Sequence, residues 1–282
     1  MANTLIPPPP ESIDRLDALL KHFSVSARLF HAGPLCGTVD IDEADVGYLH
    51  MIRRGPLRVT HRREGDLSIT QPTLLFYPQP LGHRFIAENP VGADMVCASV
   101  RFASGAASPL ARALPPIVAL SMAEIPSIGR SAALLFDEAL APQCGRQKIV
   151  DRLFEVVIIQ LIRHLMTSKA VNIGLLAGLA HPQLLRAIVA MHDHPGEAWS
   201  LERMAARAAM SRSSFAATFR DVVGVTPGDY LTSWRISLAQ AMVKQGRSLR
   251  HIAADVGYGS EVALSRAFSA RVGMSARAYK AH

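Results

Sequence analysis

The pattern of hydrophobic and polar positions changes twice along the 282-residue chain. Between residues 25 and 102, short runs rich in β-branched residues and leucine are separated by turn residues every eight to twelve positions. Short strands at such even spacing are typical of a sandwich or a small barrel. The pattern predicts strands over residues 26–31, 35–41, 46–54, 57–63, 67–70, 73–77, 83–88 and 94–102.

Helical periodicity flanks this strand-rich region on both sides. A short amphipathic helix is predicted over residues 12–22, with Ser12 as its N-cap. After the strands, helices are predicted over residues 110–114, 125–140 and 146–166. The last of these is apolar around more than one face, which indicates either complete burial or an apolar face that meets a partner. We therefore expect helix 146–166 either to pack wholly on the barrel and on residues 125–140, or to form a homodimer contact.

The final third of the chain contains two copies of one sequence pattern, over residues 201–224 and 248–273. Each copy has a small residue after an apolar one in a first helix, a serine that opens a second helix, a core phenylalanine and a closing glycine. These pairs are Ala205 and Ala253, Ser211 and Ser260, Phe219 and Phe268, and Gly224 and Gly273. The repeat predicts helix-turn-helix motifs over 201–222 and 249–272, joined by a rigid helix over 227–244.

Charge is distributed unequally between the two ends of the chain. Residues 1–197 contain 18 Lys and Arg against 18 Asp and Glu, whereas residues 198–282 contain 12 against 5. The whole net charge of +7 therefore lies in the final third. A basic domain beside a neutral one indicates a polyanionic partner that only one end meets. The alternative is a surface whose charges serve only solubility.

The second helix of a helix-turn-helix lies in the major groove of double-stranded DNA and presents its N-terminal half to base edges. Small residues allow the backbone to approach, and arginine reaches guanine edges or phosphates. The predicted DNA-contacting residues are Ser211, Arg212, Ser213, Ala216, Ala217 and Arg220 in the first copy, and Ser260, Glu261, Val262, Ser265 and Arg266 in the second. Because the first set is mostly Ser and Ala, we expect sequence selectivity to depend more on the second helix and on DNA shape.

The last hundred residues resemble the DNA-binding domain of the AraC/XylS family of bacterial transcription regulators. The matching residues are Leu201, Ala205, Ser211, Phe215, Phe219, Gly224-Val225-Thr226-Pro227 with Tyr230, Arg235, Ala239, Ile252, Ala253, Val256-Gly257-Tyr258, Phe268, Gly273 and Tyr279. Ala276 and Lys280 stand where the family has proline and arginine, so we expect a less rigid closing turn. The resemblance implies regulation of transcription through double-stranded DNA, with RNA polymerase as a candidate partner.

The strand-rich region resembles the cupin-like sensing domain that many AraC-family proteins carry. The expected fold class is α+β, with an N-terminal cupin-like β-barrel and flanking helices, followed by an all-α domain whose two helix-turn-helix motifs are joined by a linker helix. We expect an effector and dimerisation domain over residues 1–167, with a disordered tail over 1–11. A linker over 168–180 and the DNA-binding domain over 181–282 follow. The effector is expected to be an unidentified small molecule or a metal.

The candidate metal ligands come from four different predicted strands. The first cupin metal motif is not matched, since Gly47 is followed only by His50, while Pro78 and His83 retain part of the second motif. Two thiolates and two imidazoles, from Cys36, His50, His83 and Cys97, would make a tetrahedral zinc set. The alternative is two free buried cysteines and two ordinary barrel histidines.

Several classes of protein are not expected. No apolar window approaches the length of a transmembrane helix, and the N-terminal residues lack the features of a secretory signal. A cytoplasmic protein that makes no membrane contact is therefore expected. No phosphate loop or nucleophile elbow is present, so we do not expect an enzyme. Two alternatives stay open: a cupin-type metalloenzyme with an appended nucleic-acid-binding module, and a DNA-organising protein without effector control.

One histidine cluster interrupts the helical pattern just before the double motif. His192-Asp193-His194 stands at the end of a helix predicted over 182–192, immediately before Pro195. Cationic side chains are favoured at helix C-termini. We therefore interpret these histidines as a helix-end cap rather than as a ligand pair.

Overall fold

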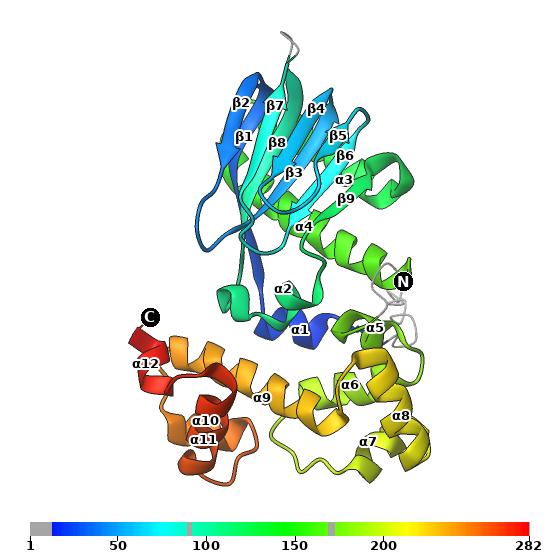
Figure 1. Ribbon diagram of the computed structural model, residues 1–282, viewed down its shortest axis with the longest axis vertical. Coiled ribbons are helices and arrows are strands. Elements are labelled where there is room, and N and C mark those ends of the chain that lie inside the picture. The colour runs from blue at the N-terminus through cyan, green and yellow to red at the C-terminus, as the bar shows by residue number, and fades with distance from the viewer. Residues whose placement is uncertain (1–12, 89–91, 169–172, 282) are drawn as a thin grey trace, which may run out of the picture.

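The structure is a computed structural model that describes residues 13–88, 92–168 and 173–281. Its N-terminal part is built from two facing β-sheets with helices outside them, and its C-terminal part is entirely helical (Figure 1). No helix in these ranges is both long and apolar enough to span a lipid bilayer. The expected α+β class, with strands first and helices last, is confirmed.

All eight predicted strands are present, and a ninth follows them. Their bounds are β1 Val25–Leu35, β2 Gly37–Ile41, β3 Gly47–Arg54, β4 Leu57–His61, β5 Leu67–Ile69, β6 Thr73–Tyr77, β7 His83–Ala87, β8 Ala93–Phe102 and β9 Val118–Ser121. Strand β9, which the sequence pattern does not predict, pairs antiparallel with β6. One sheet has the order β1-β8-β3-β6-β9 and the other the order β2-β7-β4-β5.

Strand β3 shows how the sheets divide the N-terminal core. Leu49 and Met51 join the core that extends to the helices, while Tyr48 and Ile52 join a second core between the two sheets. Both faces are therefore buried, and the strand reads as a continuous apolar run rather than an alternating one. His50 is the polar residue in this run, and it is completely buried.

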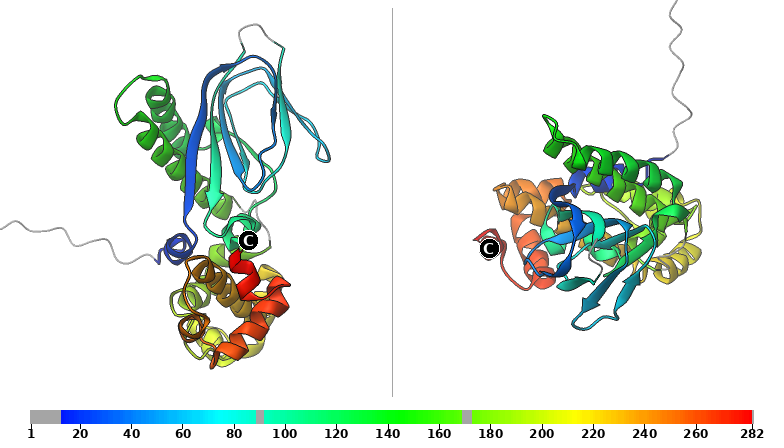
Figure 2. Two further views of the ribbon diagram at one scale, coloured as in Figure 1. Left: turned by 90° about the vertical axis from the view of Figure 1, so that its left-hand side faces the viewer. Right: turned by 90° about the horizontal axis from the view of Figure 1, so that it is seen from above.

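Two long helices, α3 (Pro126–Leu140) and α4 (Arg146–Thr167), lie outside the sheets and run beside β1 (Figure 2, left). Helix α4 contacts both α3 and β1. It also covers the edge of the sheet, since the Leu29 N–H donates to Asp151 Oδ1 at 2.9 Å. An unpaired edge strand would otherwise be open to other chains. Packing of α4 on the domain is therefore confirmed, while Ile149 and Val156 on the same helix stay 46% and 43% exposed.

Short helices connect the strands, the long helices and the C-terminal domain (Figure 1). They are α1 (Asp17–His22), η1 (Gly105–Ala107), α2 (Pro109–Ala113), η2 (Met122–Glu124), α5 (Leu175–Ala180) and α6 (Leu184–Asp193). Helix α1 begins later than predicted, and the proposed cap Ser12 lies outside the described residues. The prediction of a linker over 168–180 is wrong for residues 175–180. That segment is a helix whose leucines are buried against α4, α6 and α8, and residues 169–172 lie outside the described part.

The C-terminal helices follow the predicted double motif closely. They are α7 (Leu201–Arg207), α8 (Arg212–Val223), α9 (Pro227–Lys244), α10 (Leu249–Asp255), α11 (Glu261–Val272) and α12 (Ala276–Ala281). Helix α9 lies between the pairs α7–α8 and α10–α11 and contacts all four of these helices. The expected linker helix between two helix-turn-helix units is confirmed.

An aromatic contact joins the N-terminal part to the helical domain. The ring of Phe23, directly after α1, meets Trp234 of α9 edge-on, with ring centroids 5.2 Å apart. On its other side, Trp234 stacks on His192 of α6 at 3.7 Å. His192 Nε2 shares a 2.6 Å hydrogen bond with the Tyr230 hydroxyl. The interpretation of His192 as a helix-end cap is therefore wrong, because this side chain is completely buried in the core.

Burial lowers the pKa of His192 to about 3, because a charged imidazolium in this apolar contact would be unsolvated. The unfolded chain binds a proton below a pKa of about 6.5. The folded chain therefore binds fewer protons between these two values. In that window the free energy of unfolding falls as the pH falls.

We predict that the substitution His192→Phe reduces the loss of stability on acidification. Between pH 6.5 and 5, a histidine that stays neutral only in the folded state lowers the free energy of unfolding by about 2 kcal/mol. Urea unfolding at the two pH values, followed by the fluorescence of Trp199 and Trp234, measures this difference. The control His251→Phe replaces an exposed histidine and should keep the wild-type pH dependence. Equal acid sensitivity of wild type and His192→Phe would contradict the prediction.

Candidate nucleic-acid interface and sensing site

The two candidate recognition helices, α8 and α11, begin and end in the same way. Ser211 Oγ accepts a hydrogen bond from the Ser214 N–H at 3.2 Å, and Ser260 Oγ accepts one from the Ala263 N–H at 3.1 Å. Each serine satisfies a backbone donor that the first turn leaves free. Both helices end at a glycine in the left-handed region, with φ of 83° and 80°. The predicted serine caps are confirmed, and the helices proper begin one residue later, at Arg212 and Glu261.

Buried aromatic residues fix the rotation of both helices about their axes. Phe219 of α8 and Phe268 of α11 are completely buried. Each meets a tyrosine edge-on: Phe219 meets Tyr230 at 5.4 Å and Phe268 meets Tyr279 at 5.6 Å. Because one face of each helix is held in the core, the opposite face must point to solvent.

The predicted DNA-contacting residues lie on these outer faces. Exposed residues are Ser211, Arg212, Ser213, Ala217 and Arg220 of the first unit, and Ser260, Glu261, Val262 and Arg266 of the second. Ala216 and Ser265 are half-buried. The structure thus brings each predicted set together on one accessible helix surface.

The arginines of these surfaces are not equally available. The Arg212 guanidinium lies 2.9 Å from Glu202 of α7, and both side chains are more than half exposed. An exposed pair of this kind contributes little free energy and is readily exchanged for a phosphate contact. Arg220 and Arg266 have no ion-pair partner within the described ranges. These two cations are therefore the most available for DNA.

Arg235 of α9 has a structural role that the sequence analysis did not assign. Its Nε donates to the Pro195 carbonyl and its Nη2 to the Glu197 carbonyl, both at 2.8 Å. A Cβ on Gly257 would lie 2.7 Å from the same guanidinium. Arg235 therefore ties the loop before α7 to the turn of the second motif, which holds the two units together. The presence of arginine and glycine in the family pattern was the available signal.

The closing turn of the domain is capped although Ala276 replaces the family proline. Ser275 Oγ accepts a hydrogen bond from the Ala278 N–H at 3.2 Å, and Ala276 is buried. Lys244 Nζ lies 5.2 Å above the Tyr279 ring, which adds a cation–π contact. The reduced rigidity of this turn stays a prediction.

Two histidines meet inside the N-terminal domain, between the sheets. His50 Nε2 and His83 Nε2 are 3.0 Å apart, and both side chains are buried. His83 Nδ1 lies 2.8 Å from the Leu81 carbonyl, which can only accept, so neutral His83 carries its proton on Nδ1. His50 Nε2 must then donate to the lone pair of His83 Nε2. His50 Nδ1 is left buried without a hydrogen-bond partner.

Burial keeps these groups in their neutral forms. It holds the pKa of His50 well below its usual range and lowers that of His83 to about 4, since each charged imidazolium would be desolvated. Burial likewise raises the pKa of the Cys97 thiol well above its usual range. Neutral imidazole is the form that binds a metal, whereas a protonated thiol must first lose its proton.

The structure assembles only part of the predicted zinc set. His50 and His83 lie together, and Cys97 is the cross-strand partner of His50. Cys36 is exposed and shares a cavity of about 400 Å³ with Cys97. Within the described ranges, no group of three or more His, Cys, Asp or Glu side chains is arranged to hold a metal. The four residues therefore do not form the expected tetrahedral site in this conformation.

The sequence analysis missed two neighbours of the histidine pair. Tyr77 stacks on His83 with ring centroids 4.2 Å apart, and its hydroxyl shares a 2.9 Å hydrogen bond with His61 Nε2. His61 is the cross-strand partner of His83 on β4. The pairing register of β4 and β7 places His61 beside His83, and the facing of the two sheets places Tyr77 of β6 against them. Spacing along the chain reveals neither arrangement.

Comparison with known protein families covers nearly the whole described fold. A family model described as cupin matches residues 14–167, and one described as a helix-turn-helix domain matches residues 204–282. The first match alone exceeds half of the chain and contains both sheets. The second contains α8 and α11 with their caps.

Known relatives match both halves. A protein named as an AraC-like transcription regulator from Streptomyces antibioticus is 37% identical over 185 residues, which are 64% of this chain and 61% of that protein. The chain thus spans less than two thirds of that relative. An uncharacterised HTH-type transcriptional regulator from Haemophilus influenzae is 28% identical over 84% of this chain and 87% of its own length.

Among solved structures, the chain is similar to the DNA-binding domain of AdpA, a global transcriptional factor in complex with target DNA. The match is 32% identical, covers 36% of this chain and 92% of that one, and has a TM-score of 0.35. The two family matches agree with the division of the fold into a strand-rich and a helical part. The chain belongs to the cupin family over residues 14–167, and its residues 204–282 match the model of a helix-turn-helix domain.

Proposed function

We propose that the protein regulates transcription by sequence-specific binding of double-stranded DNA, under the control of a small molecule or metal ion in its N-terminal domain. The observation that carries the proposal is the pair of capped recognition helices with exposed arginines, placed in the part of the chain that holds the whole net charge of +7. Such a domain combines phosphate attraction with side chains for base edges. RNA polymerase is the partner on which such a regulator acts, directly or by competition for DNA.

The geometry supports two DNA-contacting helices on a single chain. If α8 and α11 enter successive major grooves on one side of B-DNA, they sit roughly one helical turn, about 34 Å, apart. Helix α9 contacts both units and fixes their spacing. A DNA site bound by both helices is asymmetric, because the outer faces of α8 and α11 carry different side chains.

Arg220 and Arg266 are the recognition-helix arginines without an ion-pair partner in the described ranges. Arg266→Ala should cost about 1–3 kcal/mol at one base pair and relax selectivity at that position. Arg220→Ala, in a helix surface made mostly of Ser and Ala, should weaken binding more evenly across sequences. Binding sequences are selected from a random pool with wild-type protein, and single-base variants of the selected site are then titrated by fluorescence anisotropy at fixed salt.

Arg63→Ala serves as the control, since this exposed arginine lies in the N-terminal domain. Failure of the wild type to enrich any sequence, with steep salt dependence, would contradict the proposed function and favour a DNA-organising protein. Equal loss on all sequences for Arg266→Ala would show that this residue contacts only phosphate.

We further propose that the protein forms a homodimer through α4, in the region 146–166. The support is the apolar surface that packing leaves uncovered on the α3–α4 pair: Ile149, Val156, Leu134 and Leu140 are each 43–54% exposed. Apolar side chains gathered on adjacent helices are typical of subunit contacts.

Val156→Glu should therefore shift a concentration-dependent dimer to monomer, because the contact would bury an unpaired carboxylate. Sedimentation of the full chain over a hundredfold range of concentration measures the shift. Val225→Glu places the same charge at an equally exposed position, 43%, in the C-terminal domain and should leave the dimer intact. A wild type that stays monomeric throughout would rule out the contact.

We also propose that His50 and His83 bind a divalent metal ion such as zinc. Two nitrogens on one tetrahedral zinc lie about 3.3 Å apart, and the two Nε2 atoms are 3.0 Å apart. The Nδ1–H of His83 is directed to a backbone carbonyl, which is how metal-ligating histidines are usually oriented. This pair supplies two ligands. Deprotonated Cys97 or a bound effector would have to complete the set.

Purified protein should then contain close to one equivalent of zinc, and His83→Gln should reduce this below a tenth. Elemental analysis after dialysis without chelator gives the content directly. His251→Gln, an exposed histidine of the C-terminal domain, should retain the wild-type content. Wild-type protein with less than a tenth of an equivalent would contradict the metal proposal and leave a small molecule as the effector.

A further inference from the structure

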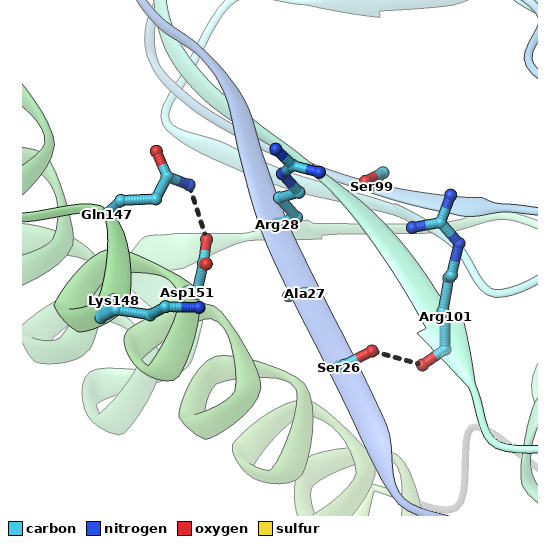
Figure 3. A pocket seen from close by; sticks show the side chains of 8 residues that line it. All are labelled: Ser26, Ala27, Arg28, Ser99, Arg101, Gln147, Lys148 and Asp151. Carbon is cyan, nitrogen blue, oxygen red and sulfur yellow. Dashed lines mark hydrogen bonds between the residues drawn. The ribbon is translucent and has the colours of Figure 1, made fainter.

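A basic cleft of about 470 Å³ crosses the edge strand β1 on the outside of the N-terminal domain. Figure 3 shows Lys148 of α4 on one side of β1, and Arg28 of β1 and Arg101 of β8 on the other. This volume is within the range of small-molecule sites. The cleft is separate from the histidine pair, which lies between the sheets.

The strand register places the two arginines on one face of the sheet. Arg28 is the cross-strand partner of Ser99, and Ser26 is the partner of Arg101. The arginines are thus diagonal neighbours, within reach of one ligand. Their guanidinium groups extend to either side of the Ser99 hydroxyl in Figure 3. Guanidinium forks and a hydroxyl are well suited to the oxygens of a carboxylate or phosphate.

The acidic residue of the cleft, Asp151, already accepts hydrogen bonds from the protein. Asp151 Oδ1 accepts hydrogen bonds at 2.9 Å from the Leu29 N–H and from Gln147 Nε2. Arg28 and Lys148 have no ion-pair partner in the described part of the chain. Arg101 lies 3.9 Å from Glu43, and both side chains are more than half exposed, so water screens this contact.

The charges of the cleft therefore do not balance. Three cations against one carboxylate leave a local charge of +2, in a part of the chain whose Lys and Arg equal its Asp and Glu. Helix α4 begins beside the cleft with Arg146 and Lys148 and has no acidic residue in its first turn, so its N-terminal dipole adds to the positive potential. We propose that this cleft binds a small dianion, a phosphate or a dicarboxylate, that bridges Arg28 and Arg101 to Lys148.

Packing contacts connect both walls of the cleft to the DNA-binding domain. Strand β1 follows α1 and Phe23, which contacts Trp234 of α9. Helix α4 contacts α5, which in turn contacts recognition helix α8. A dianion that holds β1 to α4 would therefore favour one arrangement of the two parts, which is the condition for an effector. This regulatory consequence rests on the proposed function, whereas binding itself does not.

The test is calorimetric titration of the full chain with inorganic phosphate and with succinate, each in chloride buffer of matched ionic strength. Saturable binding is expected for at least one, and the stronger probe identifies the class. Arg28→Gln and Lys148→Gln should each weaken binding by roughly tenfold or more, since each removes a charge-assisted hydrogen bond. Asp151→Asn should strengthen it several-fold, because it removes a repelling charge. Arg63→Gln, an exposed arginine elsewhere in the domain, is the matched control.

Absence of saturable binding for both probes overturns the proposal, and so does binding that Arg28→Gln and Lys148→Gln leave unchanged. The strengthening by Asp151→Asn is a result that a merely structural role would not produce. DNA binding of the wild type is measured separately with and without the tighter probe. An affinity for DNA that the probe does not change overturns the regulatory consequence but not the site, and absence of DNA binding overturns the proposed function alone.

Discussion

A continuous aromatic contact connects the first DNA-reading helix to the N-terminal domain, and the arrangement of the two parts depends on it. Phe219 of α8 meets Tyr230, which is hydrogen-bonded to His192, and His192 stacks on Trp234, which meets Phe23. Each ring is fixed by its neighbours on both sides, because offset and edge-on aromatic pairs have defined geometries. A shift of α1 by a fraction of a ring width would therefore disturb the support of α8. Apolar residues of both parts, such as Phe23 and Trp234, belong to one core cluster.

The two helix-turn-helix units share one construction but differ in their surroundings. Phe219–Tyr230 and Phe268–Tyr279 are equivalent pairs, each formed where a recognition helix leads through a glycine to the next helix. In the first unit the tyrosine belongs to α9, which Trp234 ties to the N-terminal domain. In the second it belongs to the terminal helix α12, which packs on α9 and α11. Helix α8 is thus supported by the helix that Trp234 ties to the N-terminal domain, while α11 is held through α9 and α12.

Local patterns were sufficient to predict most of the fold, and long-range register was not. The short apolar runs and intervening turn residues of 25–102 predicted eight strands, and Ser211 and Ser260 marked the recognition helices, because turn residues, caps and periodicity are local properties. Strand β9 was missed because its four residues carry no periodic signal of their own. The leucines of 175–180 were assigned to a linker because residues 168–180 contain two glycines and no strong helix cap. The cleft at Arg28 depends on the β1–β8 register and on the docking of α4, which spacing along the chain does not encode.

The distribution of charge and burial separates the roles of the polar residues. In the C-terminal domain, arginines on outer helix faces face solvent, where exposure keeps them available to phosphates at little desolvation cost. In the N-terminal domain, His50 and His83 are kept neutral by burial, so they provide lone pairs rather than charge. The cleft between β1 and α4 holds three exposed cations, of which Arg28 and Lys148 have no ion-pair partner in the described part of the chain. A switch needs a ligand that binds one arrangement of packed elements more tightly than another. Of these sites, the cleft is the one whose two walls connect separately to α9, through Phe23 and Trp234, and to α8, through α5.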